Sequence, residues 1–551
     1  MITLRKNEKF KGRSGPLVLI IMDGVGLGKD NEGNAKFLAR TPTLDMLSKN
    51  FLNASLLAHG SAVGLPSNKD MGNSEVGHNA LGAGRIFDQG SKLVSNAIET
   101  GKIFNNDTWK ELIEKPLSEN KQLHLIGLLS DGNIHSHIDH LFKIIERAAK
   151  EGLKRVKIHI LLDGRDVPET SALIYVDKLE EYLETYKSKG LDFCIASGGG
   201  RMKTTMDRYE ANWSIVKYGW DAHVLGKARP FNSTKEAIET FRKENIGIPD
   251  QYLPSFTIVN GGEPIGAVMD GDSVIFFNFR GDRAIELSKA FEEENFSFFD
   301  RERFPKIVYS GIMEYDGDLK IPKKYLVTPP LINKTISEYL INSRCRQYAI
   351  SETQKFGHVT YFWNGNRSGK FSEELETYEE IPSDKIEFDQ RPWMKAAEIT
   401  DRTIDALKSK KYDFLRLNFP NGDMVGHTGN LMAAIIAAET VDLCLTRLIP
   451  ILKEENCITV ITADHGNLDE MFEIDKQGNF LLDKTTGDMK KKTAHTLNPV
   501  PFIIFDPEYN NEYCLKTFND DPGLTNVTST LLILMGYDPP EEYMPSLIEL
   551  L

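Results

Sequence analysis

The chain has 551 residues, with 66 Lys and Arg against 80 Asp and Glu, so its formal net charge is −14. This length corresponds to several domains, and a hydrophobic content of 40% is enough for a sizeable core, which excludes a disordered chain. The acidic balance excludes a general nucleic-acid binder, because such proteins carry a basic face. The 5 cysteines show no C-x-x-C spacing, so neither a disulfide framework nor a thiolate zinc site is expected.

The start of the chain is basic and is followed by an apolar run at residues 17–22, an order that also occurs in signal peptides. This run is shorter than the roughly 7–15 residues of a signal-peptide core, and it ends at Asp23 instead of a small-residue cleavage site. No run in the sequence approaches the roughly 18 apolar residues of a membrane span. We therefore expect a cytoplasmic protein with no membrane partner, in which residues 17–22 form a buried strand.

Short apolar runs recur along the chain, and each is bounded by polar or glycine-rich residues. Runs of this length, rich in β-branched residues, are typical of buried parallel strands. The spacing of apolar residues at 139–150 and 433–453 predicts helices between them. In chain order the predicted strands are 17–22, 123–129, 156–162, 193–196 (ending at the glycine-rich turn 197–201), 274–279, 414–418 and 458–462, with a further strand at 501–505.

Alternating strands and helices predict βαβ units and an open α/β sheet, in which ligands bind beyond the carboxyl ends of the strands. Asp and His residues follow strands near the start and in the last third of the chain, whereas Arg and Gly dominate the middle. This distribution predicts one domain formed from both chain ends, residues 1–88 and 330–551. A second α/β domain, residues 89–329, would be inserted between them.

Carboxylate and imidazole side chains lie at the predicted strand ends of the first domain. Asp423 and His427 are four residues apart, so on a helix they would face the same way. Taken singly, an Asp at a strand end is more often a helix cap or turn former, and a His is more often a surface or core residue. Together, six oxygen and nitrogen ligands without a thiolate suit two sites for Mn²⁺, Mg²⁺, Co²⁺ or Zn²⁺. The six candidates are Asp23, Asp423, His427, Asp464, His465 and His495.

Ser74 opens a predicted helix within the segment MGNSEVGH, residues 71–78. On the local pattern alone it would be an ordinary N-cap serine. The same position would also aim the backbone N–H groups of the helix at an anion. A free hydroxyl is a poor nucleophile near neutral pH, and metal coordination is one way to activate it. Ser74 is therefore the candidate nucleophile.

Eight motifs, in this order along the chain, resemble those of the cofactor-independent phosphoglycerate mutases, which belong to the alkaline phosphatase superfamily. The Asp and His motifs alone indicate only the superfamily, whereas GNSEVGH, DGRD and NFRxDR narrow the resemblance to the mutases. The motifs are MDGVG (22–26), GNSEVGH (72–78), DGNIHSH (131–137), LDGRD (162–166), NFRGDR (278–283), DMVGH (423–427), ADHG (463–466) and TAH (493–495).

The resemblance implies interconversion of 3-phosphoglycerate and 2-phosphoglycerate through a phosphorylated Ser74, without bisphosphoglycerate, by a monomer. It implies two divalent ions, most often Mn²⁺, with Mg²⁺ or Co²⁺ in some members. Departures are small: Gly281 replaces a frequent proline, Asn133 replaces a frequent glycine, and the segment before His495 resembles a longer hairpin. One ion would be held by Asp23, Ser74, Asp464 and His465, and the other by Asp423, His427 and His495.

Arginines at predicted strand ends mark the middle third of the chain. A mutase must hold both a carboxylate and a phosphate, and arginine binds such groups through two parallel hydrogen bonds. Each arginine alone is more often a surface salt-bridge residue. By resemblance Lys355 also contacts the phosphate of the substrate. In the mechanism that we expect, the metal ions and Lys355 spread the charge of the transition state, and Asp166 accepts a proton from the 2-hydroxyl. The expected substrate-binding residues are His135, Arg165, Asp166, Arg201, Arg208, Arg280, Arg283 and Lys355.

Two other interpretations stay open on the sequence. A metal phosphatase, phosphodiesterase or phosphopentomutase of the same superfamily would share the Asp and His motifs, but it would not need the DGRD and NFRxDR turns. A protein of another class would bind metal or phosphoglycerate without turnover. The presence of every ligand type needed for turnover favours the enzyme.

Overall fold

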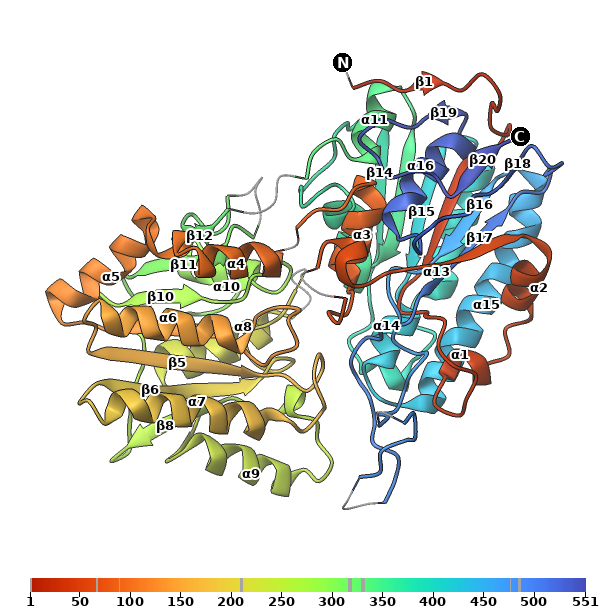
Figure 1. The fold of residues 1–551 in the computed structure, drawn as a ribbon. Coiled ribbons are helices and arrows are strands. Elements are labelled where there is room, and N and C mark those ends of the chain that lie inside the picture. Colours follow the sequence, from red (N-terminus) through yellow and green to blue (C-terminus); the bar gives the residue numbers. More distant parts are fainter. Residues whose placement is uncertain are drawn as a thin grey trace. The chain divides into compact units, whose positions relative to one another are not determined.

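The structure is a computed structural model that describes residues 2–65, 68–88, 90–208, 212–315, 320–328, 332–475, 477–483 and 487–551. The chain divides into two compact units (Figure 1). Unit 1 combines Met1–Gln89 with Leu331–Leu551, and unit 2 is Gly90–Pro330. Each unit has its own mixed sheet, helices and hydrophobic core, so the protein is of the α/β class.

Unit 1 is built on a seven-stranded sheet. Its first five strands in spatial order are parallel, whereas β17 is antiparallel to both of its neighbours. The central strand β2 is buried over its whole length, because it carries six consecutive apolar residues. In spatial order the strands are β14 (Glu376–Ile381), β13 (Gln347–Glu352), β15 (Phe414–Phe419), β2 (Leu17–Met22), β16 (Thr459–Thr462), β17 (Val500–Phe505) and β3 (Leu52–Leu56).

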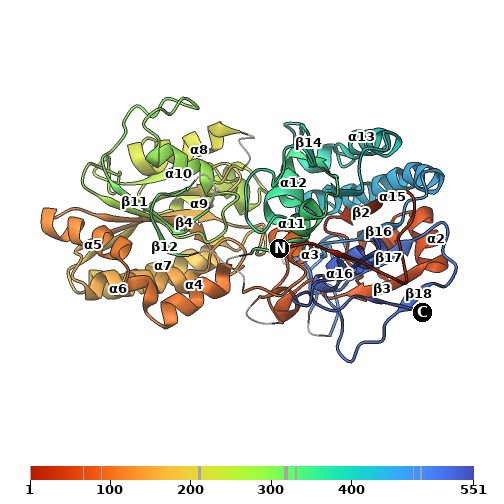
Figure 2. The ribbon, with the colours of Figure 1, turned by 90° about the horizontal axis from the view of Figure 1, so that it is seen from above.

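Helices cover both faces of this sheet, with α13 and α15 on one side and α3 and α16 on the other (Figure 2). The longest, α15, starts after Asn430, whose side chain accepts a hydrogen bond from the Ala433 N–H and so caps the helix. The α-helices that the structure describes in unit 1 are α1 (Ala35–Leu38), α2 (Pro42–Asn50), α3 (Ser74–Ala83), α11 (Ile336–Asn342), α12 (Thr353–Gly357), α13 (Ala396–Lys408), α14 (Asn421–Gly426), α15 (Leu431–Glu454) and α16 (Thr525–Leu534), and the π-helix η5 (His358–Phe362) follows α12.

Unit 2 is built on a nine-stranded sheet. Six strands from β12 to β6 are parallel, and β8 joins β6 in the antiparallel direction. In spatial order the strands are β12 (Tyr325–Val327), β11 (Val308–Met313), β10 (Ser273–Phe276), β4 (Leu123–Leu129), β5 (Arg155–Leu162), β6 (Asp192–Gly200), β8 (Phe256–Asn260) and β7 (Arg229–Phe231), with β9 (Glu263–Pro264) beside β8.

In unit 2, α6 and α7 lie on one face of the sheet and α8 and α10 on the other (Figure 2). The predicted helix at 139–150 is α6, whose buried side chains recur at helical spacing. The helices of unit 2 are α4 (Gly90–Glu99), α5 (Asp107–Glu119), α6 (Ile138–Lys150), α7 (Ala172–Lys187), α8 (Trp213–Trp220), the π-helix η3 (Asp221–Leu225), α9 (Thr234–Glu244) and α10 (Ile285–Glu292).

The glycine-rich segment 197–201 differs from its prediction. We expected a turn after Ala196, but β6 continues to Gly200. A Cβ atom on Gly198 would lie 2.7 Å from the Ile160 carbonyl oxygen, and one on Gly200 would lie 2.5 Å from the Asp250 carbonyl oxygen. These glycines therefore permit close backbone packing in the sheet, and they do not form a phosphate-binding loop.

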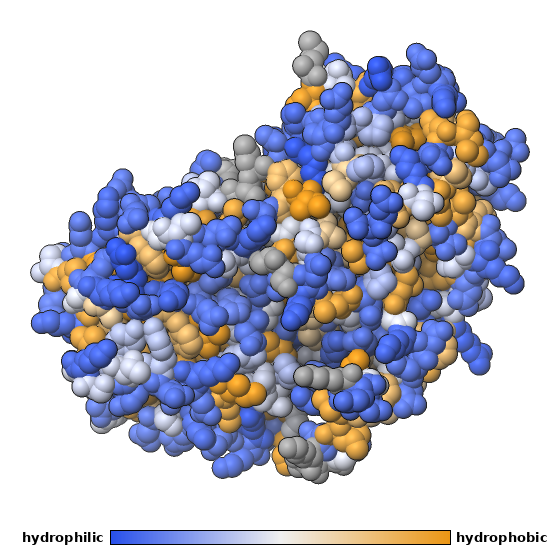
Figure 3. Space-filling model, in the orientation of Figure 1, coloured by the Kyte–Doolittle hydropathy of each residue, from blue (hydrophilic) through white to orange (hydrophobic). Residues whose placement is uncertain are grey.

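Hydrophilic side chains cover most of the face shown in Figure 3, and apolar side chains gather there in scattered patches. Within the described ranges, no helix is both long enough and apolar enough to cross a membrane. The segment before His495 contains antiparallel bridges between Phe472 and Lys491 and between Leu482 and Met489, as in a hairpin. Residues 476 and 484–486 of this segment lie outside the described residues.

Candidate functional site

Three neighbouring parallel strands bring the carboxylates of unit 1 together. Asp23 follows β2, and Asp464 follows β16, which pairs with β2. On the other side of β2, β15 leads into α14, which contains Asp423 and ends before His427. His427 Nε2 lies 2.9 Å from Asp423 Oδ1, so the two side chains face the same way, as their spacing predicted.

Ser74 is the first residue of α3, but it is not the N-cap. Asn73 caps the helix, because its side-chain oxygen accepts a hydrogen bond of 3.1 Å from the Val76 N–H. The hydroxyl of Ser74 is therefore directed elsewhere, and its Oγ lies 2.9 Å from His465 Nε2 and 3.4 Å from Asp23 Oδ1. The interpretation of Ser74 as an ordinary capping serine is wrong.

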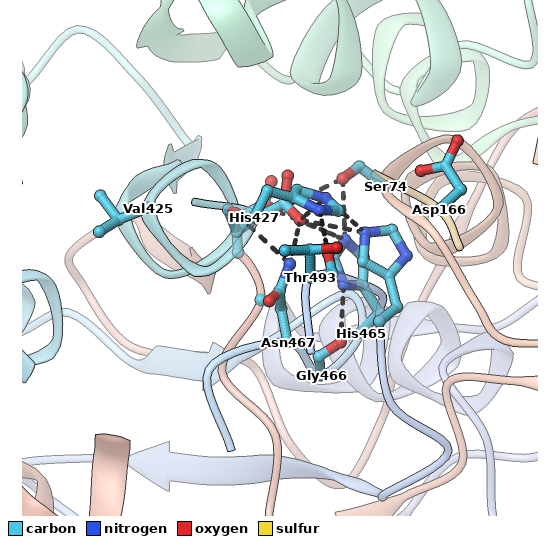
Figure 4. Close-up of polar contacts among 12 residues, drawn as sticks. Ser74, Asp166, Val425, His427, His465, Gly466, Asn467 and Thr493 are labelled. Atoms are coloured by element: carbon cyan, nitrogen blue, oxygen red, sulfur yellow. Dashed lines mark hydrogen bonds and ion pairs between the residues drawn. The ribbon is translucent and has the colours of Figure 1, made fainter. Parts of the chain in front are cut away.

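Three imidazoles direct Nε2 into the cluster, because each Nδ1 is hydrogen-bonded to a backbone carbonyl (Figure 4). Nδ1 therefore carries the proton, and Nε2 offers its lone pair. His427 Nε2 and His495 Nε2 are 3.0 Å apart, and both lie within 3.1 Å of Asp423 Oδ1. Lone pairs this close repel, so the donor set suits a cation among them. The Nδ1 contacts are 2.6 Å from His427 to Thr493 O, 3.2 Å from His465 to Gly466 O and 2.7 Å from His495 to Gly72 O.

One ammonium group contacts two buried carboxylates. Lys355 Nζ, on α12, lies 2.8 Å from Asp23 Oδ1 and 2.8 Å from Asp423 Oδ2, and it donates a hydrogen bond to Ser74 Oγ. Burial, together with the negative charge of Asp464, raises the pKa of Asp23 to about 7. Asp464 Oδ2 is buried and accepts no hydrogen bond. This excess of negative charge fits divalent cations, which oxygen and imidazole ligands bind well.

The described residues contain two groups whose ligand atoms lie close enough together to hold a metal ion: Asp423 with His465 and His495, and Asp23 with His78 and Asp464. The structure brings together all the predicted ligands, since His465 Nε2 lies 3.6 Å from Asp464 Oδ2 and 3.5 Å from Asp23 Oδ1. Two adjacent metal sites are consistent with this cluster.

Three neighbours of the ligands received no role from the sequence. His78 Nδ1 donates to the Ser74 carbonyl at 2.7 Å and lies 3.4 Å from Asp464 Oδ2. Asn418 Nδ2 donates to Asp23 Oδ2 at 2.8 Å, and Asn467 Nδ2 donates to Asp423 Oδ1 at 3.1 Å. His78 is part of the motif GNSEVGH and Asn418 ends a predicted strand, but only the folded structure shows that they orient ligands.

The predicted substrate residues of unit 2 lie beyond the carboxyl ends of β4, β5, β6 and β10. None is more than 6% exposed, so these arginines are not ordinary surface salt-bridge residues. The set comprises His135, Arg165, Asp166, Arg201, Arg208, Arg280 and Arg283.

Buried aspartates hold these arginines, and the sequence singled out only one of them, Asp166. Arg201 Nη1 lies 3.0 Å from Asp163 Oδ1 and also contacts Asp166. Asp282 accepts from Arg208 at 3.3 Å, and its Oδ1 lies 2.9 Å from Arg280 Nε. Asp163 and Asp282 belong to the DGRD and NFRxDR motifs, but their pairing with distant arginines depends on the tertiary fold.

The electrostatic field within this cluster is positive. Burial, together with Arg201 and Arg280, holds the pKa of His135 well below its ordinary value, so His135 is neutral. Burial and the neighbouring Arg208 also lower the pKa of Arg283. His135 Nδ1 is buried without a hydrogen-bond partner. A bound anion would relieve the repulsion among the arginines and could accept their hydrogen bonds.

The family model of the Metalloenzyme superfamily matches residues 15–539. The chain is 55% identical over 548 residues to a probable 2,3-bisphosphoglycerate-independent phosphoglycerate mutase of Leptospira interrogans, covering 99% of this chain and 100% of the relative. It is 52% identical over 552 residues to the 2,3-bisphosphoglycerate-independent phosphoglycerate mutase of Trypanosoma brucei brucei, covering 100% of this chain and 99% of the relative.

Among solved structures, the crystal structure of Leishmania mexicana phosphoglycerate mutase at low cobalt concentration matches with a TM-score of 0.97 and 48% identity, covering 100% of both chains. The match therefore extends over both units, including the metal-ligand cluster and the arginine cluster. The chain belongs to the family of 2,3-bisphosphoglycerate-independent phosphoglycerate mutases, within the metalloenzyme superfamily.

Proposed function

We propose that this protein interconverts 3-phosphoglycerate and 2-phosphoglycerate without bisphosphoglycerate, as the names of its relatives indicate. The observation that carries the proposal is the position of Ser74. Its Oγ lies 2.9 Å from His465 Nε2 and accepts a hydrogen bond from Lys355 Nζ, at the centre of the carboxylate and imidazole cluster. A hydroxyl in this environment is suited to accept a phosphoryl group.

We propose that unit 1 holds two divalent ions, most often Mn²⁺, with Mg²⁺ or Co²⁺ as alternatives. When bound, they would act as Lewis acids that stabilise negative charge on the oxygen atoms around them. The inward lone pairs of the three imidazoles support this, and so does Asp464 Oδ2, which is buried without a hydrogen bond. One ion would be held by Asp23, Ser74, Asp464 and His465, and the other by Asp423, His427 and His495.

Ser74 and Lys355 would carry out the first transfer. Ser74 Oγ gives up its hydroxyl proton and attacks the phosphorus of 3-phosphoglycerate, and the bond from phosphorus to the 3-oxygen breaks as the new bond forms. The 3-oxygen takes up a proton, which leaves phospho-Ser74 and glycerate. The ammonium of Lys355, already within hydrogen-bond distance of Ser74 Oγ, spreads the charge that develops on the transferring group.

Unit 2 would retain the glycerate for the second transfer. Its buried arginines can form paired hydrogen bonds with both the carboxylate and the phosphate of the substrate. The 2-hydroxyl oxygen then attacks the phosphorus of phospho-Ser74, and its proton passes to Asp166, the proposed acceptor. The bond from phosphorus to Ser74 Oγ breaks as the new bond forms, and Ser74 Oγ takes up a proton again. Asp166 contacts Arg201, and its Oδ2 lies 3.9 Å from His135 Nε2, so it belongs to the same cluster.

The test is ³¹P NMR of 3-phosphoglycerate incubated with protein that has been stripped of metal and reloaded with Mn²⁺, without bisphosphoglycerate. We expect the signal of 2-phosphoglycerate to appear and grow. Neither the metal-stripped control nor the Ser74→Ala variant should show this signal. Free phosphate as the main product would identify a phosphatase instead. Binding of 3-phosphoglycerate without any turnover would identify an inactive binding protein.

A further inference from the structure

A continuous chain of buried polar side chains crosses unit 2 outside the proposed substrate residues. It starts at Asp272 and ends at Thr205, and its side chains belong to residues that are 2% exposed or less. Chains of this kind inside a protein are held in one arrangement, because each unmade hydrogen bond would leave a buried polar group unsatisfied. The contacts are His124 Nδ1 to His159 Nε2 at 2.9 Å, His159 Nδ1 to Ser197 Oγ at 2.7 Å, Ser197 Oγ to His223 Nδ1 at 2.7 Å, and His223 Nε2 to Thr205 Oγ1 at 3.0 Å.

Asp272 sets the direction of every hydrogen bond in the chain. Its carboxylate accepts from the Gln122 N–H at 2.9 Å and the Met269 N–H at 2.8 Å, and its Oδ2 lies 3.1 Å from His124 Nε2. A carboxylate in this role only accepts, so His124 Nε2 carries the proton and His124 Nδ1 must accept from His159.

The remaining directions follow because the histidines are neutral. Burial holds the pKa of His159 well below its ordinary value and lowers that of His223 to about 3. Each neutral imidazole donates once and accepts once, so Ser197 donates to His159 and accepts from His223 Nδ1. His223 Nε2 is then an acceptor, and Thr205 donates its hydroxyl proton to it.

Thr205 needs the hydrogen bond to His223 to hold its conformation, because its backbone has a φ of +70°, in the left-handed region that β-branched residues rarely adopt. Its N–H donates to the Ile215 carbonyl at 2.8 Å. Its hydroxyl packs against α8, where a Cβ on Gly219 would lie 2.0 Å from Thr205 Oγ1. The hydrogen bond to His223 and the contact with Gly219 therefore fix the side chain from two directions.

The backbone that Thr205 fixes places two arginines of the proposed substrate cluster. The next residue, Met206, accepts a hydrogen bond of 2.5 Å at its carbonyl from Arg283 Nη1. Three residues after Thr205, Arg208 pairs with Asp282 at 3.3 Å. A change in φ at Thr205 would move the Met206 carbonyl and Arg208 together, although Thr205 and His223 are not members of the arginine cluster.

We propose that Thr205 and His223 are positioning residues for phosphoglycerate binding, through which the buried chain from Asp272 fixes Arg208 and Arg283. The inference rests on the proposed function only in the identity of the anion. Loss of the Thr205 hydroxyl would free the segment to relax toward negative φ and misalign both guanidinium groups. Because the arginines would hold the substrate in the ground state and transition state alike, the effect falls on KM rather than on kcat.

The test compares three variants of the Mn²⁺-loaded full chain. Thr205→Val keeps the size of the side chain but removes the hydroxyl, and Thr205→Ser restores the hydroxyl. Thr257→Val is the matched control, because Thr257 lies in β8, is 2% exposed, and its Oγ1 has no hydrogen-bond partner. Each variant is assayed for KM and kcat with 3-phosphoglycerate and for its dissociation constant by calorimetry.

We expect Thr205→Val to raise KM and the dissociation constant about tenfold, as for the loss of one buried hydrogen bond, with kcat within about twofold of the parent. Thr205→Ser and Thr257→Val should bind like the parent. A fall in kcat at unchanged KM would mean only less folded enzyme and would overturn the inference, as would an unchanged KM.

If Thr205→Val fails to fold, His223→Phe provides the same comparison, since a phenyl ring has neither the donor for Ser197 nor the acceptor for Thr205. An unchanged KM there would also refute the role. A parent protein that binds 3-phosphoglycerate without turnover would refute the proposed function alone, because the dissociation constants still test the inference. A parent that does not bind 3-phosphoglycerate would overturn both.

Discussion

Replacing Gly77 by alanine adds one methyl group to α3 and removes no polar atom. A Cβ atom at this position would lie 2.6 Å from the Asp464 carbonyl oxygen and 2.7 Å from Asp464 Cβ, where ordinary contact begins near 3.4 Å. Asp464 adjoins the buried end of β16 and cannot easily move, so α3 and Asp464 must separate by about 0.8 Å.

This separation acts directly on Ser74, which lies three residues earlier on the same helix. Ser74 Oγ is 2.9 Å from His465 Nε2, and a shift of this size would break that contact. Misplacement of a reacting group by about 1 Å can reduce turnover about 10²-fold, and overpacking costs about 1–3 kcal/mol of stability. We therefore expect Gly77→Ala to fold, to unfold at a lower temperature and to lose about 10²-fold in kcat.

The assay measures conversion of 3-phosphoglycerate to 2-phosphoglycerate in parallel with thermal unfolding. Gly90→Ala in α4 is the matched control, because a Cβ there first meets the flexible Met313 Sδ at 3.2 Å, and we expect parental kcat. A folded Gly77→Ala variant with parental kcat would refute the reasoning, since turnover would not then depend on the position of Ser74 Oγ beside His465 Nε2.

Three further substitutions test the site and its surroundings. Ser74→Ala should abolish detectable mutase turnover while the protein keeps its fold by circular dichroism, and full turnover would exclude a covalent route. Lys355→Met should destabilise the metal-stripped protein by about 3–5 kcal/mol in thermal unfolding, because the buried carboxylates lose their cationic partner. Mn²⁺ should restore most of the lost stability. An equal loss with and without Mn²⁺ would contradict this. Burial raises the pKa of Glu352 from its ordinary 4.5 to about 7, so the stability that its neutral form contributes is present below pH 4.5 and is lost as pH rises through 7. In urea unfolding, the free energy of unfolding of Glu352→Gln should therefore exceed that of the parent by an amount that grows to about 3 kcal/mol at pH 8. A constant difference between the two proteins from pH 5 to pH 8 would refute this prediction.

The sequence predicted individual strands and helices, because these depend on the pattern of neighbouring residues. Residues 17–22 form β2, and the helical spacing at 433–453 falls within α15, because continuous apolar runs and amphipathic spacing are set by neighbours in sequence. The mixed character of both sheets was not predicted. The antiparallel pairing of β17 with β16 and of β8 with β6 depends on contacts between distant segments, which no local window contains.

In the site, too, some features follow from the sequence pattern and others depend on contacts between distant segments. Residues after neighbouring parallel strands could be predicted to meet, since those strands end at one edge of a sheet. Asn73 and Ser74 are equally good capping residues by type, and only the backbone geometry decides that Asn73 caps α3. Lys355 lies 281 residues from Ser74 in sequence, so resemblance alone, and no spacing, predicted that it belongs to the site.

Diffraction data from Mn²⁺-soaked crystals, collected at the manganese absorption edge, would test most directly whether unit 1 binds two cations, one of them at the Ser74 hydroxyl. We expect two anomalous peaks in unit 1, one in contact with Ser74 Oγ and Asp464, and the other in contact with Asp423 and His427. Fully loaded crystals with no peak beside Ser74 would contradict the assignment of this serine as the phosphoryl acceptor.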